Sequence, residues 1–174
     1  MEINLVSKSD ARPISEYYLK NSCHLKEWEP ARENGYHSLS AWEQRTETII
    51  QDQRAGISSH FVMRDDFNTE IIAVCALTNI VRGPFQACNM GYSISEPQQG
   101  RGLMKHLCRY VITYAFEELN LNRVMANYMP GNTRSGKLLQ SLGFTVEGKA
   151  RKYLKINGRW EDHVLTSIVN TARD

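Results

Sequence analysis

The sequence of 174 residues contains no apolar run approaching the roughly twenty residues that a membrane-spanning helix requires. It also has no strong excess of charge, because 21 basic and 19 acidic residues leave a formal net charge of +2. Nucleic-acid-binding proteins usually concentrate positive charge, so we expect neither membrane association nor direct nucleic-acid binding. The first twelve residues show no apolar core or cleavage site of a signal peptide, and we expect a cytoplasmic protein.

Cysteine is also scarce, with four scattered residues (Cys23, Cys75, Cys88 and Cys108) and no Cys-x-x-Cys pair. No histidine stands near them at the spacing of zinc ligands. Cys75 and Cys108 lie in apolar segments, where a free thiol packs as a small hydrophobic group. We therefore expect reduced structural thiols, which suits a cytoplasmic protein, and no metal site.

The remaining composition is that of an ordinary globular protein, 41% hydrophobic and 23% charged, with a length that suits one domain. Ser40 and Glu43 have the spacing of a helix capping box, and Asn157-Gly158 is typical of a hairpin turn. The residue pattern predicts a strand at 3–6, helices at 14–26 and from 40, strands at 60–63, 70–80 and 87–94, a helix from 103, a strand at 123–128, a helix after 132, and strands at 144–156 and 160–169. This order describes a mixed, largely antiparallel sheet with helices packed against it.

A loop with two glycines follows the predicted strand that ends at Ile94 and precedes a long helix. Gly100 and Gly102 allow a tight turn that exposes N–H groups at a helix N-terminus, where a phosphate is favoured. Arg101 can add a cation to such a site. Lys105 stands where a dinucleotide-binding loop has its third glycine, and no GxxxxGK[ST] motif occurs. A pyrophosphate loop and a close-packed strand-to-helix turn both fit the glycine pair.

The loop resembles the [Gln/Arg]-x-x-Gly-x-[Gly/Ala] loop of GNAT acetyltransferases, which binds the pyrophosphate of coenzyme A. It departs from that motif at the first position, where Pro97 replaces the usual Gln or Arg. Asn132 and Ser135, followed by Leu142-Gly143-Phe144, resemble the N-x-x-S … L-G-F stretch of the Rim branch of that family. The resemblance spans roughly residues 12–169. Its narrower segments are His24 to Pro30, Asn79 to Gly83, Ala126 to Pro130 and Asp162 to Thr166.

This resemblance implies an α+β GNAT fold, formed by residues 1–174 as a single N-acetyltransferase domain. The sheet would be mixed, mostly antiparallel and seven-stranded, flanked by about four helices, with a splay between the fourth and fifth strands. Acetyl-CoA would be the cosubstrate, with its pantetheine arm in the splay and no metal. The implied cofactor-binding residues are Tyr92, Ser93, Ile94, Gln99, Gly100, Arg101, Gly102, Leu103, Asn132 and Ser135. For Tyr92 and Ile94 only the backbone is implicated, and we expect their side chains to pack in the core.

Acetyl transfer to an amine requires a polarised carbonyl, a neutral amine and a proton for the leaving thiolate. Many GNATs supply the proton from a tyrosine at the position that Leu139 holds here, so the resemblance makes Ser135 the candidate acid. The fourth strand offers no glutamate as the base. The candidates for the base or for acceptor contacts are Glu29, Asp162 and His163, each of which also fits an ordinary structural role. An α-amine titrates near pH 8, so a modest base or an ordered water suffices.

The function implied by the resemblance is acetylation of the N-terminal α-amine, with alanine first, of a ribosomal protein by direct attack on the thioester. Two alternatives remain open: a GNAT that acetylates a small-molecule amine, and a non-catalytic coenzyme-A-binding, ribosome-associated module. Trp28-Glu29-Pro30 and Asn127-Tyr128-Met129-Pro130 favour the protein acceptor. The expected partners are acetyl-CoA and the N-terminus of a ribosomal protein, and the expected state is a monomer or homodimer.

Overall fold

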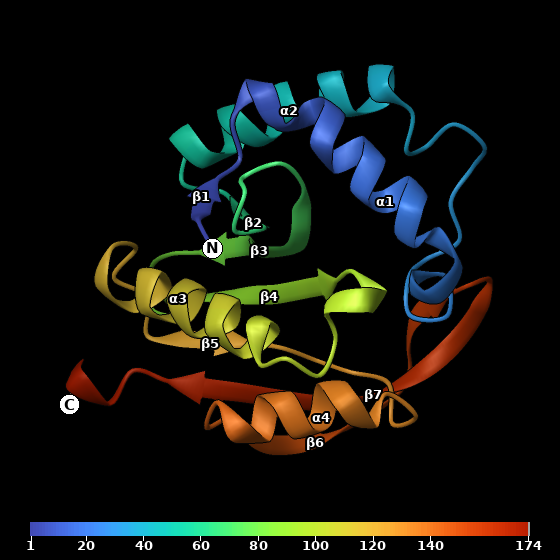
Figure 1. Cartoon of the computed structure of the whole chain (residues 1–174). Helices are drawn as coiled ribbons and strands as arrows, with labels where there is room; N and C mark the ends of the chain where they lie inside the picture. Colours follow the sequence, from blue (N-terminus) through green and yellow to red (C-terminus); the bar gives the residue numbers. More distant parts are fainter. Residues whose placement is uncertain (174) are drawn as a thin grey trace.

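The computed structural model describes residues 1–173, which form a seven-stranded sheet with helices on both faces (Figure 1). The strands run in the order β1-β2-β3-β4-β5-β7-β6, and every neighbouring pair is antiparallel except β4 and β5. The elements are β1 (Ile3–Leu5), α1 (Ala11–Leu25), α2 (Leu39–Arg54), β2 (Ser59–Arg64), β3 (Ile71–Val81), β4 (Ala87–Ile94), α3 (Leu103–Glu117), β5 (Arg123–Met125), α4 (Thr133–Ser141), β6 (Thr145–Ile156) and β7 (Arg159–Val169). The predicted mixed α+β fold is confirmed.

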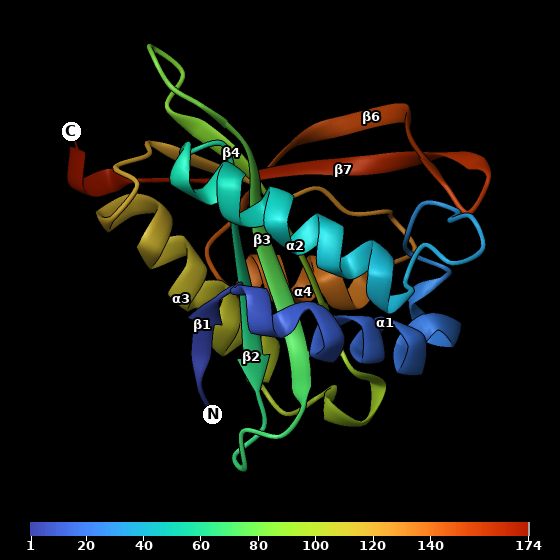
Figure 2. The same ribbon diagram turned by 90° about the horizontal axis from the view of Figure 1, so that it is seen from above.

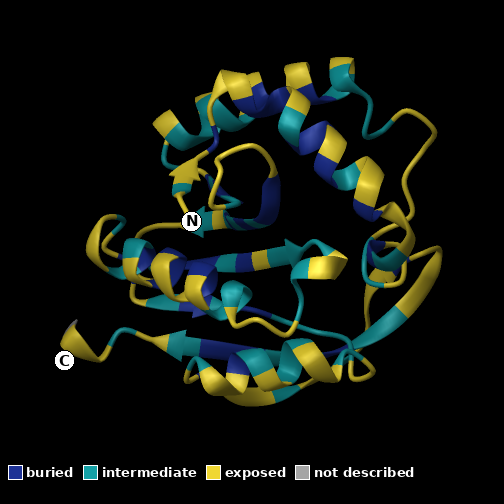
Figure 3. Cartoon of the chain, viewed as in Figure 1, coloured by how far each residue is buried: buried dark blue, intermediate teal, exposed yellow. Residues whose placement is uncertain are grey.

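Two hydrophobic cores lie on opposite faces of the sheet, because side chains alternate along each strand. Val62 and Val74 face α1 and α2, whereas Phe61, Met63 and Cys75 belong to the core that contains α3. Figure 2 shows α1 and α2 together on one side of the sheet, with α3 and α4 on the other. Buried residues follow the strands and the inward faces of these helices (Figure 3). In the described part of the chain, no helix has both the length and the apolar character needed to cross a membrane.

Two predicted helix starts are wrong. The second helix begins at Leu39 and its cap is Ser38, whose Oγ accepts a hydrogen bond from the Ala41 N–H at 3.3 Å, so Ser40 is not the cap. Helix α1 begins at Ala11, three residues before the predicted Ile14. The prediction placed the start after Pro13, but a proline in the first turn loses only a hydrogen bond that the helix end would not have made.

Strands β4 and β5 separate soon after they meet. They pair only through Ala87–Arg123, Cys88–Val124 and Asn89–Met125, while β4 continues to Ile94. The chain after β5 turns instead to β7, where Ala126 donates its N–H to the Thr166 carbonyl at 3.0 Å. The predicted strand at 123–128 therefore ends early, at Met125, with a single further bridge from Tyr128 to Val164. This separation produces the expected splay between the fourth and fifth strands.

The hairpin that joins β6 to β7 turns at the predicted position. Asn157 and Gly158 both have positive φ angles, 43° and 84°, as a tight two-residue hairpin turn requires. The Asn157 N–H donates to the carbonyl oxygen of Glu29 at 3.0 Å. The hairpin tip is therefore bound to the loop between α1 and α2, and both segments lie at one end of the sheet (Figures 1 and 2).

The packing of α3 on the sheet predicts the effect of a core truncation. Leu107 is completely buried in the α3 core, so Leu107→Ala should lower the free energy of unfolding by about 2–5 kcal/mol, measured by urea denaturation. The matched control is Leu19→Ala on α1, because Leu19 is 58% exposed, and its effect should stay within about 0.5 kcal/mol. Equal losses in the two variants would contradict this assignment of the core.

Candidate active site

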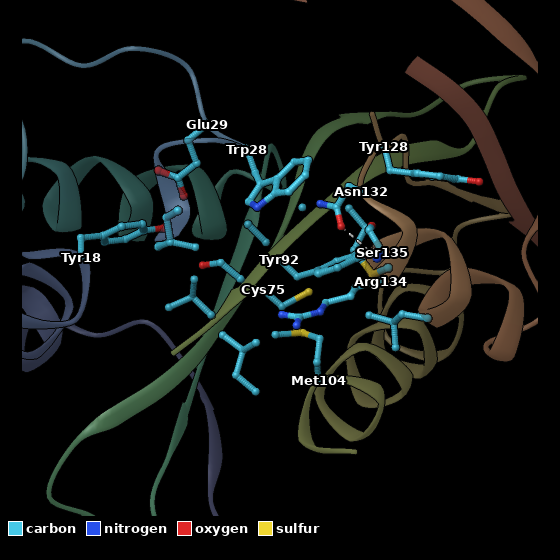
Figure 4. Close-up of a pocket in the computed structure, with 18 of the residues that line it drawn as sticks. Tyr18, Trp28, Glu29, Cys75, Tyr92, Met104, Tyr128, Asn132, Arg134 and Ser135 are labelled. Atoms are coloured by element: carbon cyan, nitrogen blue, oxygen red, sulfur yellow. Dashed lines mark hydrogen bonds between the residues drawn. The ribbon is translucent and has the colours of Figure 1, made fainter. Parts of the chain in front are cut away.

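The splay opens into a cleft of about 1580 Å³. Its walls are the loop between α1 and α2, the C-terminal half of β4, the loop after β4, the start of α4 and the tip of the β6–β7 hairpin. Figure 4 shows side chains from α1, the loop that follows it, β3, β4, α3 and the start of α4 converging on one space. A cleft of this size accepts a long, flexible ligand together with a second reactant.

The loop after β4 has the geometry of a phosphate site. Gly100 and Gly102 have φ angles of +74° and +77°, and a Cβ built at either position meets no atom within 4 Å. Gly102 is the N-cap of α3, so the unpaired N–H groups of the first helical turn lie next to this open space. Gln99, Arg101 and Leu103 line the cleft beside the glycines. The loop thus leaves room for a phosphate where backbone donors are available.

Arg134 is a cleft residue that sequence reasoning missed. It lies in the first turn of α4, and its guanidinium donates a hydrogen bond to the side-chain oxygen of Gln99 in the phosphate loop. It therefore adds a second cation near the loop that carries Arg101. Its position between Asn132 and Ser135, within the N-x-x-S motif, was the available signal.

The end of β4 is fixed by side chains from α1 and α4. The hydroxyls of Tyr17 and Ser93 are 2.9 Å apart, and Nε2 of His24 lies 3.1 Å from the carbonyl oxygen of Ile94. The Tyr92 hydroxyl lies 2.7 Å from Oγ of Ser135. The Tyr92 ring packs against the core as expected, and the contact of its hydroxyl with Ser135 is an addition that the sequence did not predict.

The start of α4 orients Ser135 toward the cleft. Asn132 caps the helix as predicted, since its side-chain oxygen accepts the Ser135 N–H at 3.1 Å. Leu139, at the position where the resemblance places a tyrosine that acts as the general acid, is 1% exposed and part of the core. Thr133 and Ser135 both carry a hydroxyl and line the cleft from α4, and Oγ of Ser135 contacts Tyr92 on β4.

Glu29 lies on the opposite wall of the cleft (Figure 4). It is half-buried, and burial raises the pKa of its carboxyl, an effect that Arg32 and His24 partly oppose. Its neighbour Trp28 also lines the cleft. A carboxylate held in a partly dehydrated site is suited to attract an ammonium group and to accept a proton.

The other two predicted acid–base candidates are placed differently from each other. His163 is buried and lines the cleft, with Nδ1 3.1 Å from the carbonyl oxygen of Glu161. Asp162 accepts the Lys152 N–H at 3.0 Å and pairs with the Lys149 ammonium at 3.1 Å. These two partners lower the pKa of the Asp162 carboxyl, and Asp162 is absent from the cleft lining. The structure thus brings Glu29, His163 and Ser135 to one cleft and leaves Asp162 outside it.

An aromatic cluster that the sequence did not predict fixes the wall that carries Glu29. The rings of Tyr18 and His37 stack 4.5 Å apart, and Trp42 stacks on Tyr18 at 5.2 Å. The guanidinium of Arg45 lies over the rings of Tyr36 and Trp42, at 3.8 and 4.6 Å. Burial lowers the pKa of His37 to about 4, so the imidazole is neutral near pH 7. Contacts of this kind attach the end of the loop, at Tyr36 and His37, to α1 and α2.

Comparison with known proteins identifies the class of protein that this fold and cleft define. Residues 2–145 match the family described as "Acetyltransferase (GNAT) domain". The chain therefore belongs to the GNAT acetyltransferase family, and it is an acetyl-CoA-dependent N-acetyltransferase. Among residues 1–173, no group of three or more His, Cys, Asp or Glu residues could hold a metal ion.

Individual relatives include acetyltransferases that are named for a ribosomal protein. The chain is 43% identical over 166 residues to the [ribosomal protein uS5]-alanine N-acetyltransferase of Escherichia coli K12, covering 95% of this chain and 86% of that protein. The structure of the ribosomal-protein-S5-alanine acetyltransferase of Vibrio fischeri superposes with a TM-score of 0.94 at 40% identity, covering 97% and 92% of the two chains. Mycobacterium smegmatis RimJ in complex with CoA-disulfide superposes with a TM-score of 0.91 at 26% identity, covering 98% and 82%.

The residues present fit coenzyme A. The open space at Gly100 and Gly102 would take the pyrophosphate, with Arg101 and Arg134 as nearby cations. The free edge of β4 beyond Asn89 would align the pantetheine arm through its backbone groups. The cosubstrate would supply the activated acetyl group as a thioester.

The phosphate loop generates a test of this assignment. Gly102→Val should abolish coenzyme A binding, measured by calorimetry, because the side chain would enter the open space at the helix N-terminus. The change also strains a backbone with φ +77°, at a cost of about 1–2 kcal/mol. Gly83→Val is the matched control, because Gly83 has φ +68° and open surroundings but lies outside the cleft lining. The affinity of Gly83→Val for coenzyme A should equal that of the wild type. An unchanged affinity in Gly102→Val would overturn the assignment of the pyrophosphate to this loop.

Proposed function

We propose that this enzyme acetylates the N-terminal α-amine of a ribosomal protein whose first residue is alanine. The observation that carries the proposal is the facing arrangement in the cleft, with the half-buried carboxylate of Glu29 on one wall and the hydroxyl of Ser135 on the other. The relatives at 43% and 40% identity, named for alanine acetylation on a ribosomal protein, support the same acceptor.

In the proposed reaction, Glu29 attracts the α-ammonium group and accepts its proton, directly or through a water. A raised pKa makes this carboxylate a better base than an exposed one, and an α-amine, with a pKa near 8, gives up its proton readily. We assign the base to Glu29 rather than to His163, because His163 is only 4% exposed and is therefore less accessible to an incoming amine than the half-buried Glu29.

The amine nitrogen then attacks the thioester carbonyl, whose developing charge is stabilised by backbone N–H groups of β4. The new C–N bond forms as the C–S bond breaks, and the sulfur keeps the electron pair of that bond. Ser135 donates a proton to this sulfur. The α-ammonium nitrogen loses two protons in all, one to Glu29 before the attack and one after the C–N bond forms. One of them restores the Ser135 hydroxyl through solvent and the other is released, so the protons balance.

We propose that residues 1–174 act as a single N-acetyltransferase domain in the cytoplasm, where ribosomal proteins are made. The absence of direct nucleic-acid binding and the monomeric or homodimeric state remain predictions.

The acceptor is tested first with synthetic peptides and acetyl-CoA. A peptide that begins with alanine and contains an internal lysine should be acetylated once, at its α-amine, with the site located by mass spectrometry. The same peptide with a blocked N-terminus should be inert, and spermidine should react far more slowly. Acetylation of the lysine side chain, or faster turnover of spermidine, would refute the proposed acceptor. Binding of acetyl-CoA without turnover of any amine would support a non-catalytic module.

Glu29→Gln tests whether the cleft wall that carries Glu29 binds the acceptor amine. Loss of the charge should raise KM for the alanine peptide on the order of tenfold, the value of one charge-assisted hydrogen bond, and leave KM for acetyl-CoA unchanged. The same change should raise the free energy of unfolding near pH 7, because the folded state disfavours the ionised carboxylate. This gain should disappear as the pH falls below about 4.3, the pKa of glutamate in an unfolded chain.

The matched control is Glu33→Gln, because Glu33 lies on the same loop but is exposed and absent from the cleft lining. It should change neither KM nor stability. Steady-state kinetics and urea denaturation at pH 4 and 7 measure both effects. An unchanged peptide KM in Glu29→Gln would remove Glu29 from the acceptor site.

A further inference from the structure

The hydroxyl of Tyr92 has an unusual position for the side chain of a strand residue. Tyr92 lies on the part of β4 that has separated from β5, and its ring crosses toward the first turn of α4 (Figure 4). There its hydroxyl lies 2.7 Å from Oγ of Ser135, the hydroxyl assigned above as the proton donor. The contact joins the strand that binds the thioester arm to the helix that carries the acid.

The direction of this hydrogen bond follows from the chemistry of the two groups. A phenol is a stronger donor than an aliphatic alcohol, so Tyr92 donates and Oγ of Ser135 accepts. Burial raises the pKa of the Tyr92 hydroxyl, which therefore keeps its proton at every pH where the enzyme works. The Ser135 O–H is then free to point into the cleft that both residues line.

Ser135 is also fixed through its backbone. Its N–H donates to the side-chain oxygen of Asn132 at 3.1 Å, which sets the position of the first turn of α4. With the backbone held by Asn132 and Oγ held by Tyr92, the remaining freedom of the serine is the direction of its proton. An O–H that accepts one hydrogen bond is polarised and becomes a better donor in the next.

We propose that Tyr92 is a positioning residue, which holds the hydroxyl of Ser135 with its proton directed at the leaving thiolate; this rests on the proposed acid role of Ser135. As the C–S bond breaks, the electron pair stays on sulfur and the Ser135 proton moves to it. The Tyr92 O–H stabilises the charge that develops on Oγ until solvent returns the proton released by the acetylated nitrogen. Tyr92 keeps its own proton throughout.

The test is a double-mutant cycle of Tyr92→Phe and Ser135→Ala, with the alanine peptide as acceptor. Each single variant should lower kcat on the order of ten- to a hundredfold, which is at or just below the usual contribution of a general acid. KM for acetyl-CoA should stay within about twofold of the wild-type value. The double variant should be no slower than Ser135→Ala, because Tyr92 acts through that serine. A kcat within twofold of wild type in Tyr92→Phe, or multiplicative losses in the double variant, would overturn the proposal.

Tyr114→Phe is the matched control. It removes a phenol hydroxyl from a partly buried tyrosine on α3, whose ring packs on Phe61 with centroids 5.0 Å apart, and Tyr114 does not line the cleft. It should leave kcat near the wild-type value. An equal loss of kcat in Tyr114→Phe would show that the effect of Tyr92→Phe is only structural.

Two further measurements separate the possible failures. Hydrolysis of acetyl-CoA without an amine breaks the same C–S bond, so the four variants are also compared in that reaction. Wild-type enzyme that acetylates no N-terminal peptide would refute the proposed function, while the hydrolysis rates would still decide the role of Tyr92.

If Tyr92→Phe does not fold, 3-fluorotyrosine is placed at position 92, because fluorine makes the phenol a stronger hydrogen-bond donor with little change of shape. It should raise the hydrolysis rate about twofold, and an unchanged rate would overturn the proposal.

Discussion

The separation of β5 from β4 is the constraint on which the rest of the site depends. The two strands share three residue pairs, after which β5 ends and its chain joins β7. The remaining length of β4 has no neighbouring strand on that side, so its hydrogen-bonding groups there, apart from the Ile94 carbonyl that lies against His24, can meet a ligand. The phosphate loop begins where this free segment ends, and the first turn of α4 lies across the gap. The sites that we propose for the cofactor, the acid and the acceptor therefore all depend on this one interrupted pairing.

The free segment of β4 is rigid even though it lacks a neighbour on one side. Strand β3 pairs with its other edge as far as Ile94, and residues of α1 hold its end through Ser93 and the Ile94 carbonyl. The Asn21 side chain also accepts the N–H of Glu96 at 3.1 Å, just beyond the strand. Helix α1, which leads into the loop that carries Glu29, is thus attached to the strand that we propose to bind the cosubstrate. A site built on fixed elements holds reacting groups within the narrow tolerances that transfer requires.

The sequence predicted the elements and their order because hydrophobic period and turn residues are local properties. The glycine loop, the Asn132 cap and the hairpin at Asn157-Gly158 were found for the same reason. The end of β5 was missed, because strand periodicity does not reveal which neighbour a residue pairs with. The contact between Tyr92 and Ser135 joins residues 43 positions apart, so no local pattern reports it.

The acid–base candidates show the same limit. Asp162 and His163 are adjacent in sequence, and alternation along β7 sends one into the cleft and the other to Lys149. Which of the two faces the cleft depends on the packing of the whole hairpin. The raised pKa of Glu29 likewise results from burial rather than from its neighbours Arg32 and His24, which oppose it.

The hydrogen bond from Asn157 to Glu29 has a consequence for how this fold diversifies. It joins the tip of the last hairpin to the loop near the start of the chain, so the acceptor wall is assembled from both ends of the sequence. The donor half of the cleft is built from the middle of the chain, in β4, the glycine loop and α4. A new acceptor preference can therefore arise by changes in the loop between α1 and α2 and in the tip of the β6–β7 hairpin. The segments proposed to bind the thioester would then stay unchanged.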